Sequence, residues 1–262
     1  MKKLRIITIS SALLAVLVAA QISCNSSSSG PSETTGHGGG HWSYSGATGP
    51  EHWDDLDPQW AACKSGTNQS PVDITDPVTH ASADMEFHYK ASAGTVVNNG
   101  HTIVFTPTDG GYILVSGKQY NLLQFHFHTP SEHLVNGSAY RMEGHLVSQA
   151  ADGNYAVVGV FYDSGNGNNV VETVFGAVSD TENHETAVTA EVDANGLLPS
   201  GMAYYRYSGS LTTPPCTEGL VWSVFETPST AAETDIQKME NLYGGNARPA
   251  QNLNGRTINH MM

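Results

Sequence analysis

The stretch of residues 121–128, with the sequence Asn-Leu-Leu-Gln-Phe-His-Phe-His, constrains the fold more than any other part of the chain. In a β-strand, successive side chains point to opposite faces, so Gln124, His126 and His128 share one face of this stretch. Phe125 and Phe127 point to the other face. The alternation therefore predicts a strand that presents two imidazoles side by side to one pocket.

A third histidine follows in the segment Glu143-Gly-His145-Leu-Val147, where the same alternation places Glu143 and His145 on one face. Three neutral imidazoles are one of the ligand sets of catalytic zinc, which keeps a fourth position open for water. Taken alone, two histidines spaced in this way on a strand are more often a solvated or core pair. The pattern therefore suggests a metal site without establishing it.

The size and charge of the chain limit the classes of function. Its 262 residues and 39% hydrophobic content suffice for one sizeable core, so we expect a single catalytic domain over residues 41–262. Lys and Arg total 11 against 25 Asp and Glu, a formal charge of −14. Such a charge disfavours binding to a phosphate backbone or to an anionic membrane surface. We therefore exclude nucleic acid as a partner.

Residues 1–24 have the pattern of an export signal: a basic start, an apolar stretch over 6–20 that is short for a membrane span, and small residues after it. Cleavage after Ala20 would release the protein. Cleavage before Cys24 resembles the processing of a bacterial lipoprotein and would leave a lipid anchor. Both sites remain open, so we expect an exported protein, either periplasmic or lipid-anchored at the cell envelope.

Residues 25–40 are rich in Ser, Gly and Thr and predict a flexible, disordered linker. The segment His37-Gly-Gly-Gly-His41 could hold a metal loosely, but a flexible hinge is the simpler interpretation. An exported chain is expected to pair its cysteines, and Cys63 can pair with Cys216. Lipidation would account for the remaining Cys24, and a free thiol is the alternative.

From residue 84 onward, short runs rich in Val, Thr, Tyr and Phe alternate with turn residues, which is typical of strands. The strands that we predict from these runs lie at 85–89, 95–98, 102–106, 112–115, 156–162, 204–207 and 221–226. Helical spacing is weak and predicts helices only at 169–177 and 230–243. The chain is therefore expected to be mostly a sheet.

Over nearly all of residues 42–256, the chain resembles an alpha-class carbonic anhydrase of the exported bacterial type. The motifs that carry the resemblance are Gly49-Pro-Glu-His-Trp53, Gln69-Ser-Pro-Val-Asp-Ile74, Asn98-Asn-Gly-His101, Gln124-Phe-His-Phe-His128, Ser131-Glu-His133, Glu143-Gly-His-Leu-Val147, Leu211-Thr-Thr-Pro-Pro215 and Asn246-Ala-Arg-Pro249. Each motif alone is unspecific, but all of them in this order are not expected by chance. The resemblance implies a mainly β fold with a large mixed, mostly antiparallel central sheet and a few short surface helices.

The resemblance also implies an enzyme, a zinc lyase that hydrates carbon dioxide reversibly to bicarbonate and a proton by attack of a zinc-bound hydroxide. The ligands of the one Zn²⁺ per chain would be His126, His128 and His145. A ligand imidazole needs its other nitrogen hydrogen-bonded to fix the tautomer. Gln124 would serve His126 and Glu143 would serve His145, while a backbone carbonyl near Asn246 would serve the remaining histidine.

Further roles follow from the resemblance for Glu132 and Thr212. An ionised Glu132 only accepts hydrogen bonds, so a Thr212 hydroxyl bonded to it must donate, which leaves the threonine oxygen to accept the proton of the zinc-bound hydroxide. Thr213 would line the product side. An apolar wall suits carbon dioxide, which has no net dipole. The residues that match this wall are Val147, Val157, Leu211 and Trp222.

His101 occupies the position of the family's proton shuttle, because an imidazole can accept and release a proton near neutral pH. Tyr44 and Asn99 match residues that order the waters between zinc and shuttle. Val104 departs from the family pattern, where a polar residue is common. The resemblance also pairs Cys63 with Cys216 in a disulfide, and exported bacterial relatives suggest a homodimer.

Other functions fit parts of the sequence. A zinc hydrolase could use the same nucleophile on small esters. A catalytically silent relative that serves as a binding module would be expected to lose a zinc histidine, and all three are present. A lipoprotein that scavenges zinc would not require Thr212, Glu132 and the apolar wall together. Hydration of carbon dioxide accounts for all of these features.

Overall fold

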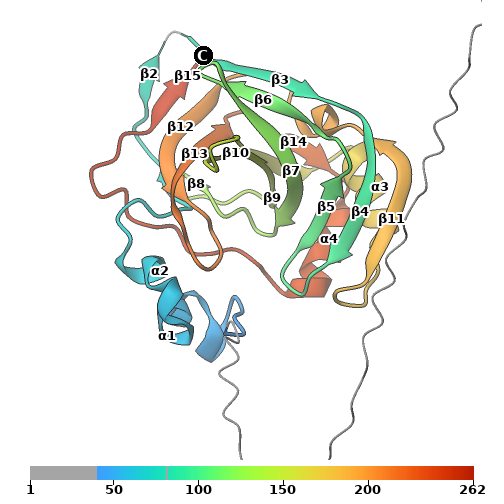
Figure 1. Ribbon diagram of the computed structural model, residues 1–262, viewed down its shortest axis with the longest axis horizontal. Coiled ribbons are helices and arrows are strands. Elements are labelled where there is room, and N and C mark those ends of the chain that lie inside the picture. The colour runs from blue at the N-terminus through green and yellow to red at the C-terminus, as the bar shows by residue number, and fades with distance from the viewer. Residues whose placement is uncertain (1–39, 81) are drawn as a thin grey trace, which may run out of the picture. The chain divides into compact units, whose positions relative to one another are not determined.

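A sheet of 13 strands carries the histidine-rich stretch among its central strands (Figure 1). The computed structural model describes residues 40–80 and 82–262 of the chain. The sheet is mixed and mostly antiparallel, as the resemblance implied. The fold class is therefore confirmed.

In spatial order, the main path of the sheet runs through β11 (Glu185–Val192), β4 (Ser92–Asn98), β5 (Ile103–Pro107), β7 (Lys118–His128), β9 (Met142–Gln149), β10 (Tyr155–Ser164), β13 (Glu218–Phe225), β12 (Tyr204–Ser210), β15 (Asn259–Met261) and β2 (Val78–His80). Off this path lie β6 (Gly111–Val115), β3 (Met85–Tyr89) and β14 (Ser229–Ala231). The parallel pairs are β10 with β13, β10 with β14, and β15 with β2. A separate pair joins β1 (Asp73–Ile74) to β8 (Leu134–Val135).

Strand β7 is held along both edges. Its first residues pair with β6 and its later residues with β5, while β9 runs along the other edge. A two-residue turn of Ser116 and Gly117, with φ of 49° and 76°, joins β6 to β7. Two positive φ values suit the right-handed twist of a hairpin, and glycine adopts such a value without strain. The turn thereby sets the register of the strand that carries the histidines.

The helices are short, and two of them cover one face of the sheet. The α-helices are α1 (Trp53–Leu56), α2 (Ala62–Ser65), α3 (Asn169–Ala177) and α4 (Glu233–Tyr243), and the 3₁₀ helices are Gly46–Thr48, Pro50–His52, Pro58–Trp60 and Ala194–Leu197. Buried residues of α3 and α4 join the main hydrophobic core, where the Phe127 and Phe175 rings lie 5.0 Å apart. The core face of β7 is thus covered, and its histidine face is left for the site.

All strands predicted from the apolar runs are confirmed, and the helix predicted at 169–177 is confirmed at both ends. The predicted helix at 230–243 begins later, at Glu233, because 229–231 forms β14 beside β10. Strand β11 was not predicted from the sequence. Most of its side chains are exposed and only Val188 and Val192 are buried, so it contains no apolar run.

The described residues belong to one compact unit. The predicted export signal at 1–24, the lipid site at Cys24 and the linker over 25–39 lie outside the described residues, as does His37. Among the residues that are described, no helix has the length and apolar character needed to cross a membrane.

Candidate metal centre

The predicted ligands meet because β7 and β9 are adjacent strands in a fixed register. His126 on β7 lies directly opposite His145 on β9, and His128 lies opposite Glu143. On the other edge of β7, Val104 pairs with His126. Side chains at such paired positions point to the same face of the sheet. The hydrogen-bond ladder of the sheet thus places His126 and His145 side by side.

Each of the three imidazoles uses one nitrogen in a hydrogen bond. His126 Nδ1 donates to Gln124 Oε1 at 2.8 Å, and His128 Nδ1 donates to the Asn246 carbonyl at 2.7 Å. His145 bonds through its other nitrogen, Nε2, which donates to Glu143 Oε1 at 2.9 Å. Because all three partners are acceptors, the protons must lie on these nitrogens, and the remaining nitrogen of each ring keeps a free lone pair.

The remaining nitrogens are arranged to hold a metal ion. Ligand atoms of His126, His128 and His145 all lie within 4.8 Å of one another. Within the part of the chain that the structure describes, His128 Nε2 is buried and has no hydrogen-bond partner. A buried nitrogen lone pair without a donor is costly, and a metal ion would satisfy it. Three imidazoles are also a recognised donor set for zinc, so the residues fit this ion.

Glu143 anchors a buried chain of hydrogen bonds behind His145. Its Oε1 accepts a second bond, from His133 Nδ1 at 2.7 Å, and its Oε2 accepts the backbone N–H groups of Glu132 and His133, each at 2.9 Å. His133 Nε2 then accepts from the Tyr207 hydroxyl at 2.6 Å. Gly159 on β10 leaves room for this carboxylate, since a Cβ there would lie 3.1 Å from Oε1. His133 belongs to the motif Ser131-Glu-His133, but the motif alone predicted no role for it.

The electrostatic environment keeps two of the three imidazoles neutral, whereas for His145 burial is outweighed by the nearby Glu143 and Glu132, which raise its pKa. Burial lowers the pKa of His126 well below its ordinary value, and the neighbouring imidazoles lower it further. Burial also lowers the pKa of His128. Burial would raise the pKa of Glu143, but His133 and His145 outweigh it and hold that pKa well below the ordinary range. Glu143 therefore carries a charge, and His126 and His128 are neutral, as metal ligands must be.

Glu132 is fully buried beside these ligands. Its Oε1 accepts the backbone N–H of Arg248 at 2.8 Å. In residues 40–80 and 82–262, its Oε2 has no hydrogen-bond partner. The expected hydrogen bond from the Thr212 hydroxyl is therefore not formed in this structure. A buried carboxylate oxygen without a donor is costly, so this position calls for one.

A cavity of about 320 Å³ opens beside His126 and His145. The predicted wall residues Val147, Val157, Leu211 and Trp222 all line it, and so do Thr212, Thr213 and Gln124. Its apolar side follows from strand register, because Val147, Val157 and Trp222 occupy paired positions on β9, β10 and β13.

Leu123 and Tyr155 also line this cavity, although neither was predicted from the sequence. Strand alternation would turn Leu123 away from Gln124, but an irregularity in the β7–β9 ladder between Leu122 and Gln124 changes the pattern. Leu123 is a large apolar side chain that is 40% exposed. The sequence carries no signal for such a bulge.

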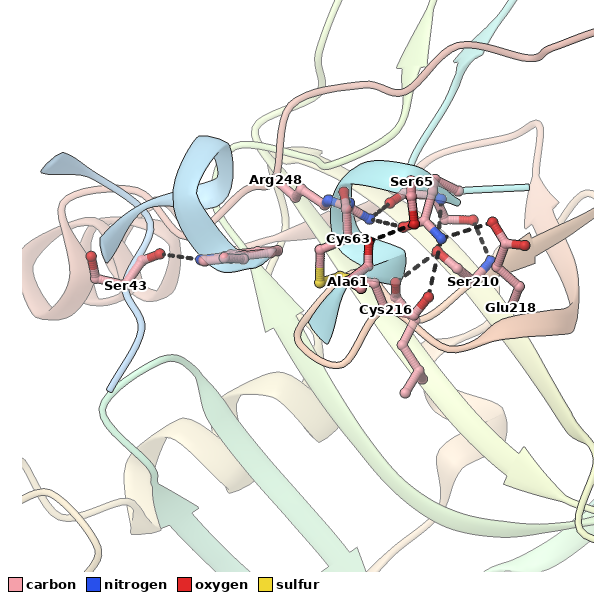
Figure 2. Close-up of a disulfide and its surroundings, with 12 residues drawn as sticks. Ser43, Ala61, Cys63, Ser65, Ser210, Cys216, Glu218 and Arg248 are labelled. Carbon is pink, nitrogen blue, oxygen red and sulfur yellow. Dashed lines mark hydrogen bonds between the residues drawn. A yellow bond between two sulfur atoms is a disulfide. The ribbon is translucent and has the colours of Figure 1, made fainter. Parts of the chain in front are cut away.

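A disulfide between Cys63 and Cys216 supports the loop that follows Leu211, and the predicted pairing is confirmed (Figure 2). The Cys216 N–H donates to the Thr213 carbonyl at 2.8 Å. The buried Arg248 guanidinium donates to the Cys63 carbonyl at 2.7 Å and to the Ser70 carbonyl at 2.7 Å. The disulfide, Arg248 and Glu132 thus form one connected support on the loop side of the site.

His101 is not among the residues that line the cavity. Its ring stacks on Trp42, with centroids 3.7 Å apart and planes at 6°. The Asn99 side chain serves the turn itself, because its Oδ1 accepts the N–H groups of His101 and Thr102 at 3.0 and 2.9 Å. Tyr44 lies nearby, with its ring edge toward His101 at 6.4 Å. The structure thus brings His101, Asn99 and Tyr44 together, and Trp42 joins them without having been predicted.

Comparisons with known proteins agree with this geometry. A family model described as eukaryotic-type carbonic anhydrase matches residues 48–262. The carbonic anhydrase of Pectobacterium carotovorum is 36% identical over 221 residues, which cover 84% of this chain and 91% of that protein. The carbonic anhydrase of Neisseria gonorrhoeae is 39% identical over 220 residues, covering 83% and 87%. The solved alpha-carbonic anhydrase of Thermovibrio ammonificans, in complex with the inhibitor sulfanilamide, superposes with a TM-score of 0.82 at 46% identity, covering 85% of this chain and 100% of that one.

Proposed function

The chain belongs to the eukaryotic-type carbonic anhydrase family, and we propose that it hydrates carbon dioxide at one zinc ion and exports the proton through His101. The observation that carries the proposal is the convergence of three imidazole nitrogens, each with its opposite nitrogen bonded to an acceptor. A zinc ion held there supplies Lewis-acid chemistry that makes a coordinated water a nucleophile at neutral pH.

The neighbours of the ligands fix their orientation. Gln124, the Asn246 carbonyl and Glu143 each accept the N–H of one imidazole. A ring that is held in this way cannot rotate and presents only its free lone pair. The negative charge of Glu143 also increases the basicity of His145. We therefore assign metal binding to His126, His128 and His145, with Gln124 and Glu143 as their orienting partners.

Glu132 and Thr212 are proposed to orient the nucleophile. Glu132 Oε2 is a buried acceptor without a donor in the described chain, and Thr212 lines the cavity. In the active enzyme, the Thr212 hydroxyl would donate to this oxygen. The threonine oxygen would then accept only from a group that carries a proton, which selects the reactive species and aims its lone pair.

The apolar side of the cavity is proposed to receive carbon dioxide. Val147, Val157 and Trp222 are all buried, and Leu211 is the fourth member of this wall. A molecule without a net dipole loses little by leaving water for such a surface. Thr213, on the polar side, would contact bicarbonate before water displaces it.

His101 is proposed to carry the proton to solvent, with Tyr44 and Asn99 ordering the waters on the way. Burial and the nearby Glu132 raise the pKa of Tyr44 well above its ordinary value, so its hydroxyl keeps its proton. Asn99 has committed its oxygen to the turn and offers its amide N–H groups. The half-buried His101 is open to buffer on its outer side.

We further propose that the chain is exported, as its N-terminal sequence predicts. The Cys63–Cys216 disulfide supports this, because such bonds persist in oxidising compartments. Whether Cys24 carries a lipid is decided by the mass of the mature N-terminus. A diacylglyceryl group on Cys24 supports the anchor, and a free Gln21 contradicts it.

The test is stopped-flow hydration of carbon dioxide with zinc content measured on the same sample. The wild-type protein should hydrate carbon dioxide rapidly with one zinc per chain, and His145→Ala should lose both properties. His88→Ala, which removes a histidine from the exposed side of β3, is the matched control and should change neither. Stoichiometric zinc without hydration in the wild-type protein would overturn the proposal.

A further inference from the structure

Glu182 lies near the turn that carries His101, and its carboxylate forms no salt bridge with the described residues. None of the ion pairs formed among the described residues involves it. It is exposed and lies in the segment that leads from α3 into β11. Neither the metal centre nor the core accounts for a negative charge at this position.

Strand register places Glu182 opposite Gly100. Strand β11 pairs antiparallel with the end of β4, where Glu185 faces Val97. Continuing this register beyond the strands sets residue 182 against residue 100. The Asn183 N–H donates to the Asn98 carbonyl at 2.7 Å and fixes the connection.

Distances confirm the placement. A Cβ added to Gly100 would lie 3.2 Å from Glu182 Oε2 and 3.3 Å from its carboxyl carbon. Gly100 has a φ of +82°, which other residues adopt only with strain. The absence of a side chain at Gly100 therefore leaves space for the carboxylate, one residue before His101.

His41 and Glu182 have opposite effects on the pKa of the His101 imidazole. Burial lowers the pKa of His101, and the nearby His41 lowers it further, while Glu182 raises it. The other groups against the ring are Trp42, which stacks on it, and Tyr44, which keeps its proton. Among the described residues that act on the ring, Glu182 is the anion that favours its protonated form.

We infer that Glu182 is a positioning residue for proton export: its carboxylate, which lies against Gly100 in the turn that carries His101, stabilises the imidazolium that forms when His101 accepts a proton. This inference rests on the proposed shuttle role of His101. Glu182 does not touch the substrate. It acts by making the His101 ring, which stacks on Trp42, a better proton acceptor.

The first test is an NMR titration of the His101 ring in the wild-type zinc enzyme and in Glu182→Gln. The variant should titrate at lower pH, by on the order of a few tenths of a pH unit, since one charge is lost through a largely aqueous dielectric. Glu191→Gln, which removes the same charge near the far end of β11, is the matched control and should not move the titration. Glu182→Asp should restore part of the shift, and about 1 M salt should reduce it, because the screening length falls to about 3 Å.

The second test is the pH profile of hydration in the same variants. Glu182→Gln should lower kcat by about twofold, because a weaker base accepts a proton less readily, and should leave kcat/KM unchanged. An unshifted His101 titration in Glu182→Gln would overturn the inference, as would an equal shift in Glu191→Gln. The shuttle proposal fails separately, if His101→Ala retains full kcat.

Discussion

The two sides of the catalytic site are held by different means. On one side, the imidazoles that we propose as metal ligands lie on the neighbouring strands β7 and β9, and His126 is paired with His145 in the ladder itself. On the other side, Thr212 and His101 lie on loops. A disulfide and a buried arginine hold the Thr212 loop, and a stack on Trp42 holds His101.

This difference predicts which property of the enzyme is impaired when residues on either side are changed. A backbone ladder fixes ligand spacing without any covalent link, and buried carboxylates and carbonyls then fix each ring. Loop groups have no ladder and depend on separate contacts. We therefore expect changes on the strand side to affect zinc binding, and changes on the loop side to affect turnover while zinc is retained.

Removal of the disulfide should have the largest effect on stability and turnover. Cys63 and Cys216 are separated by 153 residues, and closing a loop of this length contributes at most about 5 kcal/mol to the free energy of unfolding in the chain-entropy model. The Cys63→Ser/Cys216→Ser protein should melt at lower temperature and turn over more slowly, because the Thr212 loop loses its support. Zinc stoichiometry at moderate temperature should remain one per chain. Loss of zinc together with activity in a protein that is still folded would break the distinction between the two sides.

Replacement of Glu143 by Gln should weaken zinc binding by roughly 10- to 100-fold, the range typical for residues that orient a metal ligand. Glutamine retains the shape but removes the charge that holds the His145 proton on Nε2. Competition with a chelator measures the change. Glu226→Gln, which alters a surface carboxylate, is the control, and equal zinc affinity in both variants would contradict the assigned role.

The wild-type protein and Glu143→Gln should also differ in how their stability depends on acid pH. The pKa of Glu143 is well below its ordinary value of 4.5 in the folded protein, so its contribution to stability is present above about pH 4.5 and is lost as pH falls through the folded-state pKa. The advantage of the wild-type protein over Glu143→Gln should therefore decline in that acidic range. Denaturant unfolding of the metal-free proteins at several pH values measures this, and a difference that grows toward acid would be the wrong sign.

His101→Ala should lower kcat by at least about tenfold, since a positioned proton-transfer group contributes roughly 100-fold or more. Zinc content and kcat/KM should not change, because the ring lies outside the cavity. Imidazole added to the buffer should recover part of the loss. A variant with full kcat in weak buffer would remove His101 from the relay.

Leu123→Ala should have the smallest effect. This side chain lies at the cavity and is 40% exposed, so little apolar area leaves water when carbon dioxide binds. We expect stability to change by about 0.5 kcal/mol or less, as for most exposed positions. A loss of kcat/KM comparable to that of a ligand variant would show that Leu123 controls access.

The strand side of the site could be predicted from the sequence because alternation is a local property. Gln124, His126 and His128 share a face in any strand, and the hydrogen bonds expected for Gln124 and Glu143 are present in the structure. The central sheet followed from the same local signals and from the family resemblance. The carbonyl expected near Asn246 is the carbonyl of Asn246 itself.

The loop side could be predicted only in part because its contacts join distant segments. Nothing local places Trp42 against His101 or Arg248 against Cys63, and the bulge that brings Leu123 to the cavity breaks the alternation on which the prediction relied. The expected bond between Thr212 and Glu132 depends on the position of a loop, and it is not formed in this structure. Glu182 comes near His101 only through the pairing of β11 with β4, and β11 itself was not predicted.

The most direct test is exchange of labelled oxygen between carbon dioxide and water at chemical equilibrium, because this measurement separates interconversion at the metal from proton-dependent release of labelled water. The wild-type protein should show both rates. His101→Ala should keep the interconversion rate and lose most of the release rate, while His145→Ala should lose both. Equal losses of both rates in His101→Ala, with zinc still bound, would contradict the division of the site into a strand-borne metal centre and a loop-borne proton exit.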